Sequence, residues 1–234
     1  MRPAGCRWKF AAALVWLIFL STPARARPVE VELLLAVDVS ASVSPEEFEL
    51  QMRGYASAFR APQFREALKA LGTGGIAVSM MQWADIQQQR VSIPWMLVAD
   101  DASAEAFANA IDNVPRQFEQ GQTAMGHALD FALKLFPARG FEGQRRVIDV
   151  SGDGASNRGV LPNSYRDQAV KMGFTINGLA IINEERYLAG YYQRNVIGGP
   201  GAFVAVSNDF RDFAEAVLAK LVREMKGAHI AVLP

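Results

Sequence analysis

The chain has 234 residues, of which 50% are hydrophobic and 21% charged, with 24 basic and 24 acidic side chains. This length is enough for one domain with a substantial core, or for two small ones. Without its first 26 residues the chain loses four basic side chains and no acidic one, and its net charge falls to about −4. An acidic balance argues against nucleic acid or an anionic membrane surface as the partner.

The first 26 residues have the three parts of a secretory signal peptide. Arg2, Arg7 and Lys9 are basic, residues 10–20 are apolar, and Ala24-Arg25-Ala26 fits a small-x-small cleavage site. The apolar run is too short for a transmembrane helix, which needs about 20 residues. We therefore expect export to the periplasm or the cell exterior, with no transmembrane span in the mature chain. Cys6, the only cysteine, would leave with the signal peptide, so no disulfide or thiolate chemistry is expected.

After the leader, residues 31–37 form a nearly unbroken apolar, β-branched run that is typical of a strand buried on both faces of a parallel sheet. The next residues have the features of a helix start. Ser44 is placed as the N-cap, Pro45 as the first helical residue and Glu47 as the partner in a capping box. We expect this helix to continue to Arg60.

The later segments alternate between strand and helix patterns. We expect strands over residues 76–83, 90–95, 146–150, 174–182 and 202–206, with helices over 103–113, 123–136, 164–172, 184–193 and 209–226. Ser103 is the expected cap of the first of these helices, and the strand over 90–95 is expected to form a hairpin with the one before it. The pattern predicts a doubly wound, mostly parallel α/β sheet of six strands in the order 3-2-1-4-5-6, with one antiparallel edge strand and helices on both faces. It predicts a single domain over residues 27–234, with its core over 31–226.

Three loops at the carboxyl ends of strands each carry hard oxygen ligands. Asp38, Ser40 and Ser42 follow the first strand, Thr123 precedes a helix, and Asp153 follows the strand that ends near Val150. Serines and aspartates at such places are often only caps and turn residues. Three loops that meet at one sheet edge, where ligands bind in open α/β sheets, favour a shared site for a hard divalent cation.

These motifs also resemble those of the von Willebrand factor type A (VWA) domain. The resemblance covers residues 31–226 and rests on Asp-x-Ser-x-Ser at 38–42, Gly-x-Thr at 121–123 and Asp-Gly at 153–154. It implies a Rossmann-like fold with a metal-ion-dependent adhesion site (MIDAS) at Asp38, Ser40, Ser42, Thr123 and Asp153. It further implies Mg²⁺, with Mn²⁺ or Ca²⁺ possible, and a partner protein that presents an Asp or Glu carboxylate rather than a substrate. Gly152 departs from the family, which commonly has threonine there.

Two alternatives remain open from the sequence. A haloacid-dehalogenase-like, Mg²⁺-dependent phosphohydrolase also begins with an aspartate after its first strand, but it needs a second acid where this chain has Ser40. The other alternative is a VWA fold with a vacant metal site that acts as a scaffold. Asp149 is unexpected inside a buried strand and requires a partner, for which Arg145 and Arg146 are candidates. His127 and His229 are isolated and are not expected to be catalytic.

Overall fold

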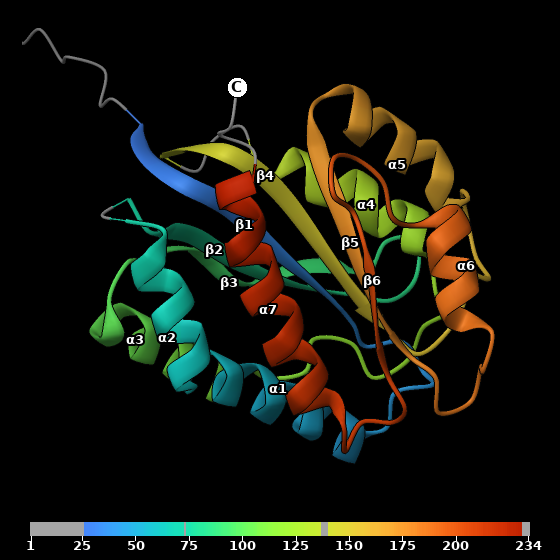
Figure 1. The fold of residues 1–234 in the computed structure, drawn as a ribbon. Coiled ribbons are helices and arrows are strands. Elements are labelled where there is room, and N and C mark those ends of the chain that lie inside the picture. The colour runs from blue at the N-terminus through green and yellow to red at the C-terminus, as the bar shows by residue number, and fades with distance from the viewer. Residues whose placement is uncertain (1–25, 73, 137–139, 231–234) are drawn as a thin grey trace, which may run out of the picture.

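The computed structural model describes residues 26–72, 74–136 and 140–230. Of the expected signal peptide it describes only Ala26, so that prediction lies outside the described residues. Six strands form one sheet in the order β3-β2-β1-β4-β5-β6. All neighbouring strands are parallel except β2 and β3, which are antiparallel. The predicted architecture is confirmed, including the hairpin and the antiparallel edge (Figure 1).

The strands match the expected positions, although several are longer. Their bounds are β1 Arg27–Asp38, β2 Ile76–Trp83, β3 Gln89–Val98, β4 Phe141–Gly152, β5 Phe174–Ile181 and β6 Val204–Ser207. All eight residues of β2 and of β5 are buried. This burial explains their nearly continuous apolar sequences, because a parallel strand covered on both faces has no solvent side.

Seven helices are present in the described part of the chain and cover both faces of the sheet (Figure 1). Their bounds are α1 Pro45–Arg60, α2 Pro62–Ala70, α3 Asp101–Asp112, α4 Met125–Lys134, α5 Pro162–Lys171, α6 Leu188–Asn195 and α7 Phe213–Ile230. One apolar core lies between the sheet and α1, α2, α3 and α7. A second core lies on the opposite face, between the sheet and α4, α5 and α6.

Helix α1 ends at Arg60 as predicted. Helix α2 was not predicted; it begins at Pro62, a position where the missing N–H of proline costs nothing. The predicted boundaries of α3 and α7 are wrong, each for a local reason. The N-cap of α3 is Asp100, and Ser103 is the third helical residue of that capping box. Helix α7 continues through Gly227 to Ile230, since a single glycine weakens a helix without necessarily ending it.

The partner of Asp149 is Lys220 of α7, not Arg145 or Arg146. Both side chains of this ion pair are fully buried. The Lys220 ammonium also lies 2.6 Å from Oε1 of Glu224, one turn further along α7. The same Glu224 oxygen accepts a hydrogen bond from Asn177 of β5 at 2.9 Å. This buried cluster of Asp149, Lys220, Glu224 and Asn177 joins α7 to the middle of the sheet.

The pairing of β2 with the edge strand β3 is irregular. The register shifts between Val78 and Met80, and again between Met80 and Met81. At this point the hydroxyl of Ser79 donates a hydrogen bond of 2.8 Å to the carbonyl of Ile93. Pro94 follows Ile93 and has no N–H to contribute to a ladder. At the other edge of the sheet, β6 has four residues.

Candidate metal centre

The first loop of the site follows β1, which ends at Asp38. The backbone N–H of Ser40 donates to Asp38 Oδ1 at 2.8 Å, which fixes one carboxylate oxygen. Four residues after Ser40, at Ser44, the chain enters α1 through the predicted capping box. There Ser44 accepts from the N–H of Glu47 at 3.2 Å, and Glu47 accepts from the N–H of Ser44 at 2.8 Å. The strand end and the helix start thus hold a short loop that presents the hydroxyls of Ser40 and Ser42.

The second loop lies just before α4. Thr123 is two residues outside this helix, which begins at Met125, so the expected helix start at 123 is wrong. Thr123 is held instead by Asn157 of the third loop. Its N–H donates to Asn157 Oδ1 at 3.0 Å, and its carbonyl accepts from the N–H of Asn157 at 3.0 Å. Its hydroxyl is left to face Ser40, with an Oγ1–Oγ distance of 3.5 Å.

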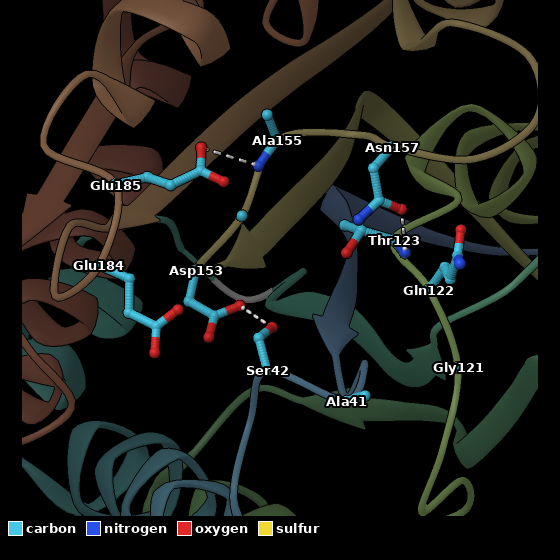
Figure 2. Close-up of a pocket in the computed structure, with 11 residues that line it drawn as sticks. Ala41, Ser42, Gly121, Gln122, Thr123, Asp153, Ala155, Asn157, Glu184 and Glu185 are labelled. Carbon is cyan, nitrogen blue, oxygen red and sulfur yellow. Dashed lines mark hydrogen bonds between the residues drawn. The ribbon is translucent and has the colours of Figure 1, made fainter.

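The third loop starts where β4 ends at Gly152. Asp153 follows directly, and its Oδ1 accepts a hydrogen bond from the hydroxyl of Ser42 at 2.8 Å (Figure 2). The Ser42 hydroxyl also lies 3.2 Å from that of Ser40. The structure therefore brings all five predicted residues together at the carboxyl edge of the sheet, around the point between β1 and β4 where the strand order reverses.

A cavity of about 470 Å³ opens over these groups. Ser42, Thr123 and Asp153 are part of its wall, and Glu184 and Glu185 from the β5–α6 loop line one side (Figure 2). The wall contains three carboxylates and no Lys or Arg. The cavity is therefore suited to a cationic occupant.

Two carboxylate oxygens at the site lack a hydrogen-bond partner within the described part of the chain. They are Asp38 Oδ2 and Asp153 Oδ2, and both are buried. Burial, and then the nearby Asp153 carboxylate, raises the pKa of Asp38 to about 8. Burial also raises the pKa of Asp153 to about 6. Such groups are costly to ionise unless a positive charge approaches them.

The donor set fits a hard divalent cation. Two buried carboxylates with free oxygens and three hydroxyls offer the oxygen ligands that Mg²⁺ and Ca²⁺ prefer. Zinc and softer metals favour nitrogen and sulfur ligands. No group of three or more His, Cys, Asp or Glu side chains with metal-binding geometry occurs among the residues with described positions. The site would thus depend on its hydroxyls for much of its coordination.

Two supporting residues were missed by sequence reasoning. Arg116 donates from Nη2 to the carbonyls of Val39 and Ser40 at 3.1 Å each, so it braces the first loop through its backbone. Asn157 holds Thr123, as described above. Neither residue belongs to a motif. Their roles depend on contacts between separate loops, which the sequence pattern does not give.

The fold is that of a VWA domain, as comparison with solved structures shows. Proximal thread matrix protein 1 from the mussel byssus matches with a TM-score of 0.60 at 18% identity, over 87% of this chain and 49% of that one; one of its structures has a zinc-occupied MIDAS motif. A von Willebrand factor type A structure from Catenulispora acidiphila matches with a TM-score of 0.55 at 17% identity, over 84% of this chain and 43% of that one.

The pilus adhesin SpaC from Lactobacillus rhamnosus GG matches with a TM-score of 0.57 at 13% identity, over 88% of this chain and 31% of that one. The chain thus spans about half or less of the length of these three proteins. No curated protein sequence matches it. A family model described as "Protein of unknown function (DUF1194)" matches residues 28–229. The chain therefore belongs to this family, and its domain has the von Willebrand factor type A fold.

Proposed function

We propose that this protein is an exported, cation-dependent protein-binding module. The observation that carries the proposal is the convergence of two buried carboxylates and three hydroxyls from three loops. Asp38 Oδ2 and Asp153 Oδ2 have no hydrogen-bond partner within the described ranges. Burial makes the ionised forms of these two carboxylates costly, and a divalent cation would balance their charges.

Mg²⁺ is the ion we propose, with Mn²⁺ or Ca²⁺ as substitutes. Ser40, Ser42 and Thr123 would contribute neutral oxygens, while Asp38 and Asp153 would act largely through water or hydrogen bonds. The bound cation would act as a Lewis acid. Because these three ligands are neutral, they would offset only part of its charge. An Asp or Glu carboxylate from a partner protein is the group best suited to that position.

We further propose that the protein is not an enzyme. A haloacid-dehalogenase-like phosphohydrolase needs an acid two residues after its nucleophilic aspartate, and this chain has Ser40 there. Such an enzyme would also have an acid shortly after the Gly152-Asp153-Gly154 turn. This chain has Asn157 there, and the Asn157 side chain accepts a hydrogen bond from the backbone N–H of Thr123. Mg²⁺-dependent release of phosphate from an aryl phosphate should stay at the level of a buffer control. Turnover that disappears in Asp38→Asn would instead favour the hydrolase.

Export to the periplasm or the cell exterior is part of the proposal and rests on the leader pattern. In the described part of the chain, no helix is long and apolar enough to cross a membrane. SpaC, which shares the fold, is a pilus adhesin. The partner is proposed to be a protein with an exposed acidic residue, and no nucleic acid is expected.

Calorimetric titration of the purified protein with MgCl₂ tests the metal site. We expect Asp153→Ala to weaken Mg²⁺ binding by about 10- to 100-fold, the effect that losing an outer-shell group typically has. His127→Ala is the matched control, because His127 lies within α4 and packs against Gly159. The Mg²⁺ affinity of His127→Ala should equal that of the wild type. Absence of Mg²⁺ binding at millimolar concentrations, or binding that ignores Asp153→Ala, would favour a scaffold with a vacant site.

A further inference from the structure

A buried tyrosine lies beside Gly152 and Asp38, at the edge of the proposed cation site. Tyr192 of α6 is 0% exposed, yet its hydroxyl has no hydrogen-bond partner among the residues whose positions are described. A buried hydroxyl without a partner costs about 1–3 kcal/mol and normally has a reason to be there. Tyr192 belongs to none of the motifs in the three loops.

Two glycines make room for this side chain. Gly178 of β5 pairs with Val150 of β4, and Gly152 of β4 pairs with Ala180 of β5, so both glycines face the same side of the sheet. A Cβ at Gly178 would lie 2.4 Å from Cδ1 of Tyr192, and a Cβ at Gly152 would lie 2.9 Å from its hydroxyl oxygen. The ring thus crosses two strands over positions that have no side chain. Glycines inside strands commonly mark such a close approach.

The tyrosine hydroxyl lies near Asp38. The position that a Cβ would take at Gly152 lies 2.8 Å from Asp38 Oδ2 and 2.9 Å from Tyr192 Oη, so both oxygens border the same small space. Both also lack partners in the described structure. The other oxygen of Asp38 already accepts from the N–H of Ser40. The free carboxylate oxygen and the free phenol are therefore complementary as acceptor and donor.

We infer that Tyr192 is a positioning residue of the cation site: its hydroxyl is the donor available to Asp38 Oδ2 across the space left by Gly152, although the two atoms are not hydrogen-bonded to each other in this structure. This inference rests on the proposed function for its role toward metal, but the contact itself does not require metal. With Ser40 at one oxygen and Tyr192 at the other, the carboxylate is held in one orientation and its ionised form is stabilised. VWA domains commonly have threonine at the position of Gly152. In this chain a glycine is then required, because a side chain there would separate the tyrosine hydroxyl from the Asp38 carboxylate.

The placement of Tyr192 also links α6 to the metal. Helix α6 follows the loop that contributes Glu184 and Glu185 to the cavity wall (Figure 2). It lies on the same face of the sheet as α4 and α5 (Figure 1). Metal that orders Asp38 should therefore also slow hydrogen exchange in residues 188–195. The tyrosine hydroxyl would be the connection between the two.

Tyr192→Phe removes the hydroxyl and keeps the ring, so the variant should fold normally. We expect its Mg²⁺ affinity to fall by about 10-fold, within the range for groups that orient metal ligands, while the variant still unfolds cooperatively in EDTA. Mg²⁺ should slow exchange in α6 less than in the wild type. Tyr191→Phe is the matched control, because the Tyr191 hydroxyl lies near Ser156 instead of Asp38. It should bind Mg²⁺ like the wild type.

A double-mutant cycle in EDTA separates this inference from the proposed function. Thermal midpoints are measured for the wild type, Tyr192→Phe, Asp38→Asn and the double variant. Non-additive shifts indicate the contact, even if the wild type binds no metal and the proposed function fails. Wild-type metal affinity in Tyr192→Phe, or additive shifts in the cycle, would overturn the positioning role while leaving the metal site intact.

Discussion

Lys220→Met tests how the buried charges in the middle of the sheet are balanced. Lys220 and Asp149 have fully buried side chains in direct contact, and Lys220 also lies 2.6 Å from Glu224. The substitution keeps most of the side-chain volume but removes the only positive charge in this cluster of four residues. Two buried carboxylates would then lie close together without an ammonium between them, with Arg145 of β4 acting on Glu224 from outside the cluster.

The expected loss can be estimated from this geometry. Removing one partner of a buried ion pair costs about 3–5 kcal/mol, because the remaining charge is left unsolvated. For a domain of this size each kcal/mol lowers the thermal midpoint by about 2–4 °C, so a fall of roughly 6–20 °C is expected. Lys69→Met is the control. Lys69 pairs with Asp101 at the surface, where side-chain exposures are 63% and 49%, and such pairs contribute little.

The loss should also depend on pH in a defined direction. Burial raises the pKa of Asp149 above its usual value, and Lys220 acts against that rise. Without Lys220 the folded protein holds a proton that the unfolded chain releases, so stability falls as pH increases above the ordinary range of an aspartate. The deficit of Lys220→Met relative to wild type should therefore be larger at pH 8 than at pH 5.

Thermal denaturation of both variants and the wild type at pH 5 and pH 8, in EDTA, gives the answer. The triple variant Asp149→Asn, Lys220→Met, Glu224→Gln should recover much of the loss, since no uncompensated charge remains. A Lys220→Met midpoint within 2 °C of Lys69→Met, or a deficit that is the same at both pH values, would refute the account of the cluster as a balanced set of buried charges.

Two further predictions concern the first loop of the site, between β1 and α1. In the metal-free protein, burial raises the pKa of Asp38 to about 8, so stability should decline from pH 5 to pH 8, because the unfolded aspartate is already ionised over this range while the folded one holds its proton. Asp38→Asn should reduce this decline, and a melting series that shows no difference between the two proteins would contradict it. Ser44→Ala should lower the free energy of unfolding by about 1 kcal/mol through loss of the cap on α1, as measured by urea denaturation. The control Ser57→Ala, on the exposed face of the same helix, should lower it clearly less.

The features that were predictable from sequence are those set by neighbouring residues. The capping box at Ser44 and Glu47 and the end of β1 at Asp38 depend on local chemistry, and the alternation of buried strands with helices indicates a doubly wound order. The convergence of Asp38, Thr123 and Asp153 followed from that order. Their geometry could be anticipated because all three lie at strand ends or helix starts.

The features that were missed depend on contacts between distant segments. Lys220 and Glu224 are spaced four apart on a helix, a pattern typical of a solvent-exposed pair, and only the packing of α7 on the sheet buries them. Tyr192 gave no signal of its own. Gly152 and Gly178 did interrupt strand patterns, which is a sign of close approach, but the sequence does not say which side chain approaches.

The irregular pairing at β3 has a consequence for how the protein meets other chains. An open sheet exposes two rows of unpaired N–H and C=O groups, which invite a foreign strand to add on. Here β6 is only four residues long, and β3 carries two register shifts and Pro94. Neither rim offers a long, flat template, so accidental strand exchange and fibre growth are discouraged. The proposed partner would then engage the loops at the carboxyl end of the sheet, where recognition depends on side chains instead of backbone.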